Sequence, residues 1–207
     1  MKDLIKFFIQ AGKLKNMPRR GWVINDIKNP ESIAEHIFRA ALMAWILGSK
    51  KKLNLDMERV LKTALIHDLC DIYARDPTPY DSILPKDPKK RKELMKTWPR
   101  LSDKEKKRLR EEKIKKEKRG LEKLTKDLPR ELRSEIIHLW FDSKKGLTKE
   151  GRFFRQADHL ESFLQAMEYH KKYKNPPKGP WWEWAREFFD DPTSLEFVDE
   201  IARKFHY

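Results

Sequence analysis

Two histidines and two aspartates stand in apolar stretches of the sequence, where a lone polar side chain would be costly to bury. They are His36, the doublet His67-Asp68, and Asp158, each flanked by Ala, Ile or Leu. Such a side chain needs either a hydrogen-bonded partner or a metal ion. Taken singly, each is more often an ordinary buried histidine or a helix-surface aspartate. Taken together, two imidazoles and two carboxylates are typical of a site for one divalent transition metal (Co, Mn, Ni, Zn or Fe).

A fifth polar residue, Asp71, follows the doublet within one helical turn. It comes four residues after His67 and three after Asp68, a spacing that places side chains on one face of a helix. Its carboxylate could orient a water molecule or act as a general acid or base, and a solvated carboxylate near a helix end is the simpler alternative. Because adjacent helical residues diverge by about 100°, ligands from other helices must complete any metal site.

The segments that carry these residues have the apolar spacing of helices. This spacing recurs over residues 3–14, 32–47, 56–69, 129–140, 153–173 and 181–207. Pro, Gly and Asn predict loops at residues 17–31 and at Asp76-Pro77-Thr78-Pro79, and residues 175–180 form a proline-rich linker before the closing helices. No segment alternates as a strand does. We therefore predict an all-α fold with a single domain over residues 1–207.

The net charge of +14, from 47 Lys and Arg against 33 Asp and Glu, is concentrated in one segment. Residues 86–126 hold 19 basic and 8 acidic residues and so carry +11, in a pattern that predicts one long charged helix with a thin apolar stripe. Three interpretations stay open: a solvated helix face, a wall that attracts anions towards a phosphate site, or a nucleic-acid surface. The last is the least supported, because the segment has a single aromatic residue on which a base could stack.

Composition excludes several classes of protein. The longest apolar run, residues 40–47, is far too short to span a bilayer, so we expect no membrane association. The first ten residues lack the apolar core and cleavage site of a signal peptide. Because Cys70 is the only cysteine and cannot form an internal disulfide, we expect a cytoplasmic protein. The aromatic cluster Trp181, Trp182 and Trp184 leaves apolar surface that suits a homodimer.

The order of these blocks resembles the HD-domain phosphohydrolases, whose pattern is a lone His, a His-Asp doublet and a distant Asp. The segments at residues 18–23, 30–36, 67–76, 131–140 and 156–169 are similar to the 5′-deoxynucleotidase branch of that family. The resemblance implies an all-helical fold, one divalent transition metal, and hydrolysis of deoxynucleoside 5′-monophosphates to deoxynucleoside and phosphate. It also implies a homodimer, and we do not expect nucleic acid as a partner.

The resemblance further implies roles for individual residues. The metal ligands would be His36, His67, Asp68 and Asp158. Asp71 stands where the family usually has a catalytic Glu, which is one methylene longer. Arg19 or Arg20 would bind phosphate, with an ambiguity of one residue in the alignment. The residues expected to contact the substrate are Trp22, Asp76, Thr78 and Pro79.

Two other functions stay open. An HD-type hydrolase could act on another nucleotide, such as a nucleoside triphosphate, an alarmone or a cyclic nucleotide. Alternatively, the chain could be a non-enzymatic helical protein that binds nucleic acid through residues 86–126. Such binding would weaken steeply with salt and would not need His67 or Asp68.

Overall fold

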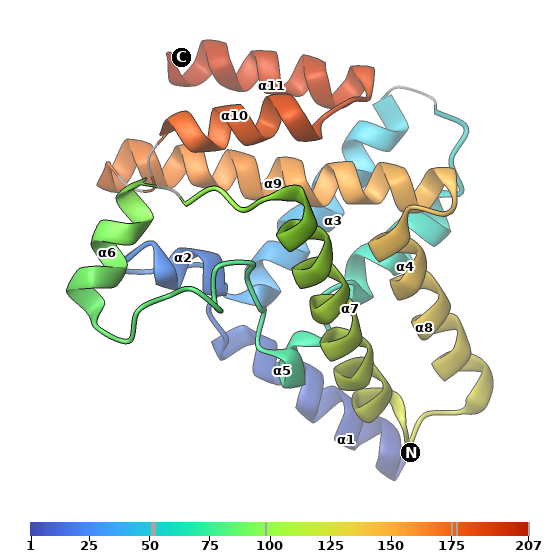
Figure 1. The fold of residues 1–207 in the computed structure, drawn as a ribbon. Coiled ribbons are helices and arrows are strands. Elements are labelled where there is room, and N and C mark those ends of the chain that lie inside the picture. Colours follow the sequence, from blue (N-terminus) through green and yellow to red (C-terminus); the bar gives the residue numbers. More distant parts are fainter. Residues whose placement is uncertain (51–52, 98, 175, 177, 207) are drawn as a thin grey trace. The chain divides into compact units, whose positions relative to one another are not determined.

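A computed structural model describes residues 1–50, 53–97, 99–174, 176 and 178–206 (Figure 1). The described part of the chain is predominantly helical and has no β-strand, only an isolated bridge between Pro18 and Ser32. The all-α prediction is therefore confirmed. Among the described residues, no helix is both long and apolar enough to cross a bilayer. Backbone contacts divide the chain into two units that are interleaved in sequence, Met1–Ala34 with Asp68–Ile137 and Glu35–His67 with His138–Tyr207.

The first unit is organised by the packing of a short helix on a long one. Its helices are α1 (Lys2–Ala11), the 3-10 helix η1 (Gly12–Asn16), α2 (Arg20–Ile24), α5 (Asp71–Ala74), α6 (Pro88–Thr97) and α7 (Asp103–Thr125). α5 packs along α7. Gly120 permits this close approach, because a Cβ atom at that position would lie 2.6 Å from the carbonyl oxygen of Cys70. The contact with α7 therefore fixes the segment that carries Asp71.

Residues 86–126 form two helices, α6 and α7, rather than the single charged helix predicted. Pro99 cannot continue a helix, and Ser102 begins α7 with a capping box in which its hydroxyl accepts from the Glu105 N–H. These local signals outweigh the helical propensity of the surrounding Lys and Glu residues.

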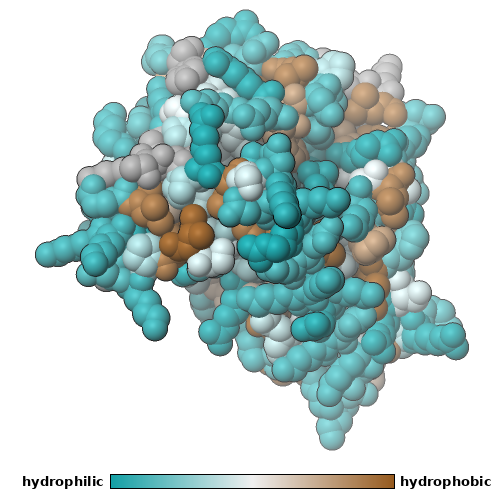
Figure 2. All heavy atoms as spheres, in the orientation of Figure 1, coloured by the Kyte–Doolittle hydropathy of each residue, from teal (hydrophilic) through white to brown (hydrophobic). Residues whose placement is uncertain are grey.

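The face of the molecule in Figure 2 is covered mostly by hydrophilic residues, with hydrophobic ones in small separate patches.

The second unit is built around the long helix α9 (Lys149–Tyr173), seen in orange in Figure 1. α9 packs against α4 (Met57–Ile66), α10 (Lys178–Phe188) and α11 (Pro192–Phe205), and most of α3 (Ile33–Lys50) and the end of α8 (Arg130–Lys145) complete the unit. A buried cluster joins α3, α4 and α9 through Ala44, Val60, Ala64, Phe154 and Ala157. Its alanines lie on α3, α4 and α9, so small side chains let these three helices approach one another.

The predicted linker over residues 175–180 is partly helical, because α10 begins at Lys178. Lys178 Nζ also donates to the carbonyl oxygen of Phe205 at 3.1 Å, which ties the beginning of α10 to the end of α11. Two other predicted linker positions, Asn175 and Pro177, lie outside the described residues.

Asp142 on α8 organises the beginning of α9. Its carboxylate accepts hydrogen bonds from the Thr148 N–H at 2.9 Å, from the Thr148 hydroxyl, and from Arg59 Nη2 at 2.8 Å. Thr148 in turn caps α9 by accepting from the Gly151 N–H at 3.1 Å. Burial alone would raise the pKa of Asp142, but the hydrogen bonds from Thr148 and Arg59 hold this pKa below its usual value.

Candidate metal centre

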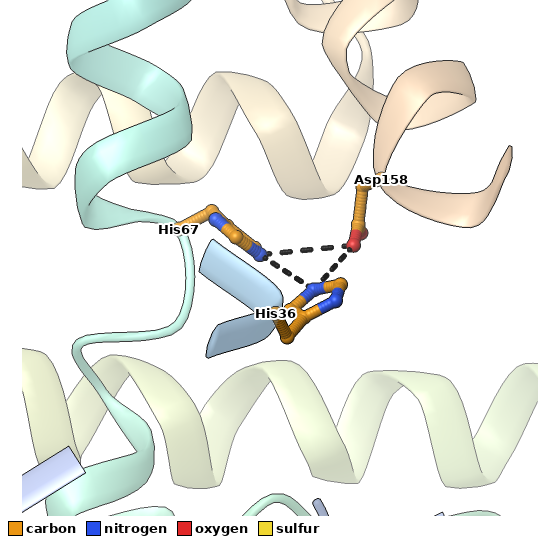
Figure 3. Close-up of side chains that lie close together, drawn as sticks. All are labelled: His36, His67 and Asp158. Atoms are coloured by element: carbon orange, nitrogen blue, oxygen red, sulfur yellow. Dashed lines mark hydrogen bonds and ion pairs between the residues drawn. The ribbon is translucent and has the colours of Figure 1, made fainter. Parts of the chain in front are cut away.

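Three of the four predicted ligand residues lie together in the second unit (Figure 3). His36 comes from α3, His67 from the turn after α4, and Asp158 from α9. Nε2 of His36 lies 3.2 Å from Nε2 of His67 and 3.0 Å from Oδ1 of Asp158, and Nε2 of His67 lies 3.7 Å from the same oxygen. Both imidazoles are buried, whereas the Asp158 side chain is 20% exposed. Two ring nitrogens and one carboxylate oxygen therefore converge on one point.

The second ring nitrogen of each histidine already has an acceptor. Nδ1 of His67 donates to the carbonyl oxygen of Ala64 at 2.7 Å, and Nδ1 of His36 contacts the buried carboxylate of Glu161. Because each partner is an acceptor, Nδ1 carries the proton in a neutral ring and Nε2 presents a lone pair. With both rings neutral, two lone pairs and a carboxylate oxygen face one another, and either a metal ion or a further proton on a ring removes the repulsion among them.

A divalent metal fits this arrangement by donor type and by spacing. Imidazole nitrogen and carboxylate oxygen suit Zn, Co, Mn, Fe and Ni, and bind Zn at about 2.0–2.2 Å. Ligand atoms at that distance from one ion, at angles of about 90–120°, lie roughly 3.0–3.6 Å apart. The three observed separations run from 3.0 to 3.7 Å. An acceptor on the outer nitrogen of each metal-binding histidine is also typical of such sites.

The charge of Asp158 is stabilised by the rings around it. Burial alone would raise the pKa of Asp158, but the adjacent imidazoles of His159, His36 and His67 hold this pKa well below its usual range. His159 is itself held in place by aromatic residues of α10. Its ring stacks on Phe188 with centroids 4.1 Å apart, and Nδ1 lies 3.5 Å from the second carboxylate oxygen of Asp158.

Glu161 and Arg39 belong to this cluster, although the sequence analysis did not select them. Nε of Arg39 donates to Glu161 at 2.9 Å, and its other nitrogens reach Gln165 and Glu168. The signal for Glu161 is its position three residues after Asp158, which places both side chains on one face of α9. Arg39 follows His36 at the same spacing on α3.

The fourth predicted ligand, Asp68, belongs to the first unit. The helix predicted over residues 56–69 ends at Ile66, and residues 67–70 form a turn. One reason is that the His67 ring donates to the Ala64 carbonyl, the acceptor that the Asp68 N–H would use in a continuing helix. The Asp71 N–H then donates to the Asp68 carbonyl at 3.0 Å. The prediction that helical spacing places Asp71 on one face with His67 and with Asp68 is therefore wrong, because no helix continues from His67 to Asp71.

Asp71 is buried among other acidic side chains. One of its carboxylate oxygens accepts from the backbone N–H of Asp76 at 3.0 Å. Burial raises the pKa of Asp71 well above its usual value, and the nearby carboxylates of Asp68, Asp76 and Glu117 raise it further. These surroundings favour the protonated form of the Asp71 carboxyl group.

The two adjacent arginines point to different partners. Nη1 of Arg19 lies 2.8 Å from Oδ2 of Asp68 and 3.5 Å from Oδ1 of Asp76. Nε of Arg20 instead pairs with Asp81 at 2.9 Å, and the Arg20 backbone N–H donates to Asp76 at 2.9 Å. The Arg19 guanidinium is therefore the one directed at Asp68 and Asp76.

The other predicted substrate residues differ in their exposure. The prediction that residues 17–31 form a loop is partly wrong, because this segment contains the helix α2, on which Trp22 lies. Trp22 is buried, and its Nε1 donates to Glu31 at 2.8 Å. Pro79 is exposed and Thr78 is partly buried. The Thr78 N–H donates to Asp81 at 2.8 Å, which fixes this loop next to Arg20.

A family model for the HD domain matches residues 11–180. The chain therefore belongs to the HD domain family, and this membership implies a bound divalent metal. The predicted resemblance is confirmed.

Named relatives and solved structures cover most of the chain. A Xenopus laevis protein named 5′-deoxynucleotidase HDDC2 is 34% identical over 175 residues, 84% of this chain and 73% of the relative. Its human counterpart of the same name is 29% identical over 201 residues, 97% of this chain and 85% of the relative. A solved structure, described as a conserved hypothetical protein from Pyrococcus furiosus, is 28% identical with a TM-score of 0.67, over 96% of this chain and 99% of that one.

Proposed function

We propose that this protein is a metal-dependent phosphohydrolase that converts deoxynucleoside 5′-monophosphates to deoxynucleoside and phosphate. The observation that carries the proposal is the convergence of His36 Nε2, His67 Nε2 and the Asp158 carboxylate, with an acceptor on the outer nitrogen of each ring. The substrate class is supported by relatives from Xenopus laevis and human that are named 5′-deoxynucleotidase.

In this proposal His36, His67 and Asp158 hold the metal, with Asp68 as a fourth ligand. When bound, the metal supplies a Lewis acid that polarises a phosphoryl oxygen and lowers the pKa of a coordinated water. Its identity among Co, Mn, Ni, Zn and Fe stays part of the proposal, because imidazole and carboxylate ligands suit all of them.

Arg19 is the residue that we assign to the phosphate. A guanidinium can donate to two phosphate oxygens at once, and this geometry stabilises the charge that develops on them during transfer. Asp68 and Asp76 restrict the orientation of Arg19, so little side-chain entropy is lost when phosphate binds. Arg20 then supports the loop by its ion pair with Asp81 rather than by contact with the substrate.

Asp71 is assigned as the proton donor. Its burial and the surrounding carboxylates favour the protonated form, and the leaving 5′ oxygen of a nucleotide needs a proton as the bond to phosphorus breaks. Asp76, Thr78 and Pro79 are assigned to the nucleoside. Trp22, which is only 3% exposed, would support the nucleoside site from the interior.

Metal content and phosphate release test the proposal together. The wild-type protein should carry about one equivalent of a divalent metal and release phosphate from deoxynucleoside monophosphates in Mn²⁺ or Co²⁺. His67→Ala and Asp158→Asn should lose both metal and activity, whereas His138→Ala, at an exposed histidine, should retain both. Equal metal content in the wild type and His67→Ala would disprove the site. Phosphate release from nucleoside triphosphates or cyclic nucleotides alone would instead support a different nucleotide substrate.

The same variants distinguish the proposed phosphohydrolase from a protein that binds nucleic acid. The latter requires that an oligonucleotide bind tightly, with steep salt dependence, and that His67→Ala leave this binding unchanged. We also retain a cytosolic setting in the proposal, because Cys70 is the only cysteine in the sequence and cannot form an internal disulfide.

We further propose that the protein is a homodimer joined through α3. The predicted interface at Trp181, Trp182 and Trp184 is not retained, because Trp182 is buried and the other two are partly buried. Residues 40–49 of this helix carry no charge in a chain of which 39% is charged, and large apolar side chains line its exposed face: Phe38, Leu42, Trp45 and Ile46. Phe38 and Trp45 are 70% and 55% exposed, and the stripe presents on the order of 400 Å² of apolar surface. A stable dimer buries about 800 Å² per partner, so this stripe would form about half of the interface. A second copy offers an uncharged surface that matches it.

Light scattering across a concentration series tests the dimer. Phe38→Asp should convert it to a monomer, and Phe8→Asp, at an exposed phenylalanine on α1, is the control. A dimer that survives Phe38→Asp, or a wild-type protein that is monomeric, would disprove the assignment.

A further inference from the structure

A line of polar side chains runs along the face of α9 that carries Asp158. Glu161, Gln165 and Glu168 follow Asp158 at spacings of three, four and three residues, so that all four lie on one side of the helix. Glu161 is fully buried and Gln165 is nearly so. A buried carboxylate on a helix is costly unless a cation and hydrogen-bond donors satisfy it.

Arg39 on α3 supplies those donors. Nε and Nη2 lie 2.9 and 2.8 Å from Oε1 of Glu161, Nη2 donates to Gln165 at 2.5 Å, and Nη1 donates to Glu168 at 2.7 Å. One planar guanidinium therefore binds three polar residues that follow one another along this face of α9. This arrangement fixes both the position and the rotamer of Glu161.

The two oxygens of Glu161 have different partners. Oε1 accepts from Arg39, and Oε2 contacts Nδ1 of His36. His36 is completely buried, and its Nε2 faces His67 and Asp158. The chain of contacts thus runs from Arg39 through Glu161 to the outer nitrogen of a proposed metal ligand.

We propose that Glu161 and Arg39 are positioning residues for the metal centre, Glu161 by fixing the ring orientation and tautomer of His36 and Arg39 by fixing Glu161. The inference rests on the metal-binding part of the proposed function. It does not depend on which substrate is hydrolysed.

The physical reason is that His36 can bind a metal through Nε2 only while Nδ1 carries the ring proton. An acceptor held rigidly at Nδ1 selects that tautomer and restricts rotation of the ring about its Cβ–Cγ bond. In Glu161→Gln one carboxylate oxygen becomes an NH₂ group. That group must face either the N–H of His36 or the N–H groups of Arg39, so a donor opposes a donor in both orientations of the amide.

Metal affinity is the direct test, measured by titrating the metal-free full-length protein with Co²⁺ and following its visible absorption. Glu161→Gln should weaken Co²⁺ binding about 10- to 100-fold, the usual effect of removing such a partner, and should shift the absorption band as the ligand field changes. Arg39→Gln should weaken binding by about tenfold, because Glu161 then loses its restraint. Glu168→Gln is the matched control, since Glu168 also binds Arg39 but lies seven residues, about two helical turns, beyond Glu161 on α9. Its Co²⁺ affinity should stay within about twofold of the wild type.

A double-mutant cycle separates positioning from general destabilisation. In the His36→Ala background, adding Glu161→Gln should have no further effect on the residual Co²⁺ affinity. If Glu161→Gln weakens Co²⁺ binding equally in that background, or if it binds Co²⁺ as tightly as Glu168→Gln does, the inference is overturned. Should Glu161→Gln fail to fold, Arg39→Gln compared with Glu168→Gln decides the question alone.

The inference and the proposed substrate fail in different ways. A wild-type protein that binds Co²⁺ but releases no phosphate from deoxynucleoside monophosphates contradicts the substrate, while the Co²⁺ affinities still test Glu161 and Arg39. An active wild-type enzyme whose Glu161→Gln variant has unchanged Co²⁺ affinity contradicts the inference and leaves the proposed function intact.

Discussion

Replacing Gly120 by alanine tests whether the close packing of α7 on α5 positions Asp71. A Cβ atom at residue 120 would lie 2.6 Å from the carbonyl oxygen of Cys70, and 3.4 and 3.5 Å from atoms of Tyr73 and Ala74. A carbon and a carbonyl oxygen normally approach no closer than about 3.3 Å. The backbone at Cys70 must therefore move by roughly 0.7 Å, and Asp71 is the next residue along the chain.

The expected change in stability is small because two effects oppose each other. Alanine in place of glycine inside a helix contributes about 1 kcal/mol, whereas overpacking of this kind costs about 1–3 kcal/mol. The net loss is about 0–2 kcal/mol, which lowers Tm by up to about 8 °C for a chain of this length. Activity should fall more, because a misplacement of about 1 Å can cost about 100-fold in rate. We expect kcat to fall about tenfold at saturating metal.

The assay compares kcat, Tm and metal content for Gly120→Ala and for Gly12→Ala. Gly12 is the control, because a Cβ atom there meets no other atom within 4 Å. Metal content should be unchanged in both variants at saturating metal, since three of the four proposed ligands, His36, His67 and Asp158, lie in the other unit. A Gly120→Ala protein that gains about 1 kcal/mol and keeps its full kcat would refute the reasoning, because helix propensity would then be the only effect.

Three further predictions concern charge. Asp142→Asn should make the free energy of unfolding depend less steeply on pH in acid. The pKa of Asp142 is lower in the folded protein than in the unfolded chain, so this residue stabilises the fold above about pH 4. That stabilisation is lost as the pH falls through the pKa of Asp142 in the folded protein. Urea unfolding at a series of pH values checks this, and equally steep acid limbs for variant and wild type would contradict it. Arg19→Lys should lower kcat/KM about 100-fold and Arg20→Lys less than about threefold, because the proposed function assigns two-point phosphate binding to Arg19, whereas Arg20 is paired with Asp81. Steady-state kinetics decide, and equal losses would contradict the assignment. Finally, kcat/KM should fall with rising KCl if α7 attracts the phosphate dianion. The double variant Lys115→Glu, Lys116→Glu should lower kcat/KM at low salt. A kcat/KM that does not change with salt would indicate that α7 is only a solvated surface.

The helices and the cluster of His36, His67 and Asp158 could be predicted because both depend on local signals. Apolar spacing reports which face of each helix is buried, and a histidine or aspartate within such a face must find a partner. The only signal for Glu161 was its spacing of three residues from Asp158, which does not by itself indicate burial. It follows Asp158 in a helix with many polar residues, and its burial depends on Arg39, which lies 122 residues earlier in the chain.

The boundaries of the helices were harder to predict than their existence. α4 ends at Ile66 because a side chain, His67, takes part in the backbone hydrogen bonding of its last turn. The charged segment divides at Pro99 and Ser102, where a proline and a capping box outweigh favourable propensity over the rest of the segment. The separation of Arg19 from Arg20 could not be predicted either, because it is set by Asp68, Asp76 and Asp81 rather than by neighbours in sequence.

The contacts of Arg39 with Glu161, Gln165 and Glu168 also determine which alignment of α3 and α9 is stable. If α3 slid along α9 by one helical turn, Arg39 would leave Glu161, and a buried carboxylate would lose its cation at a cost of about 3–5 kcal/mol. An apolar contact between the same helices would tolerate such a shift far better. The polar residues beside the proposed metal ligands therefore specify helix register before any metal binds. Substitutions of these polar residues should change both the register of α3 on α9 and the metal affinity, so the two properties cannot evolve independently at these positions.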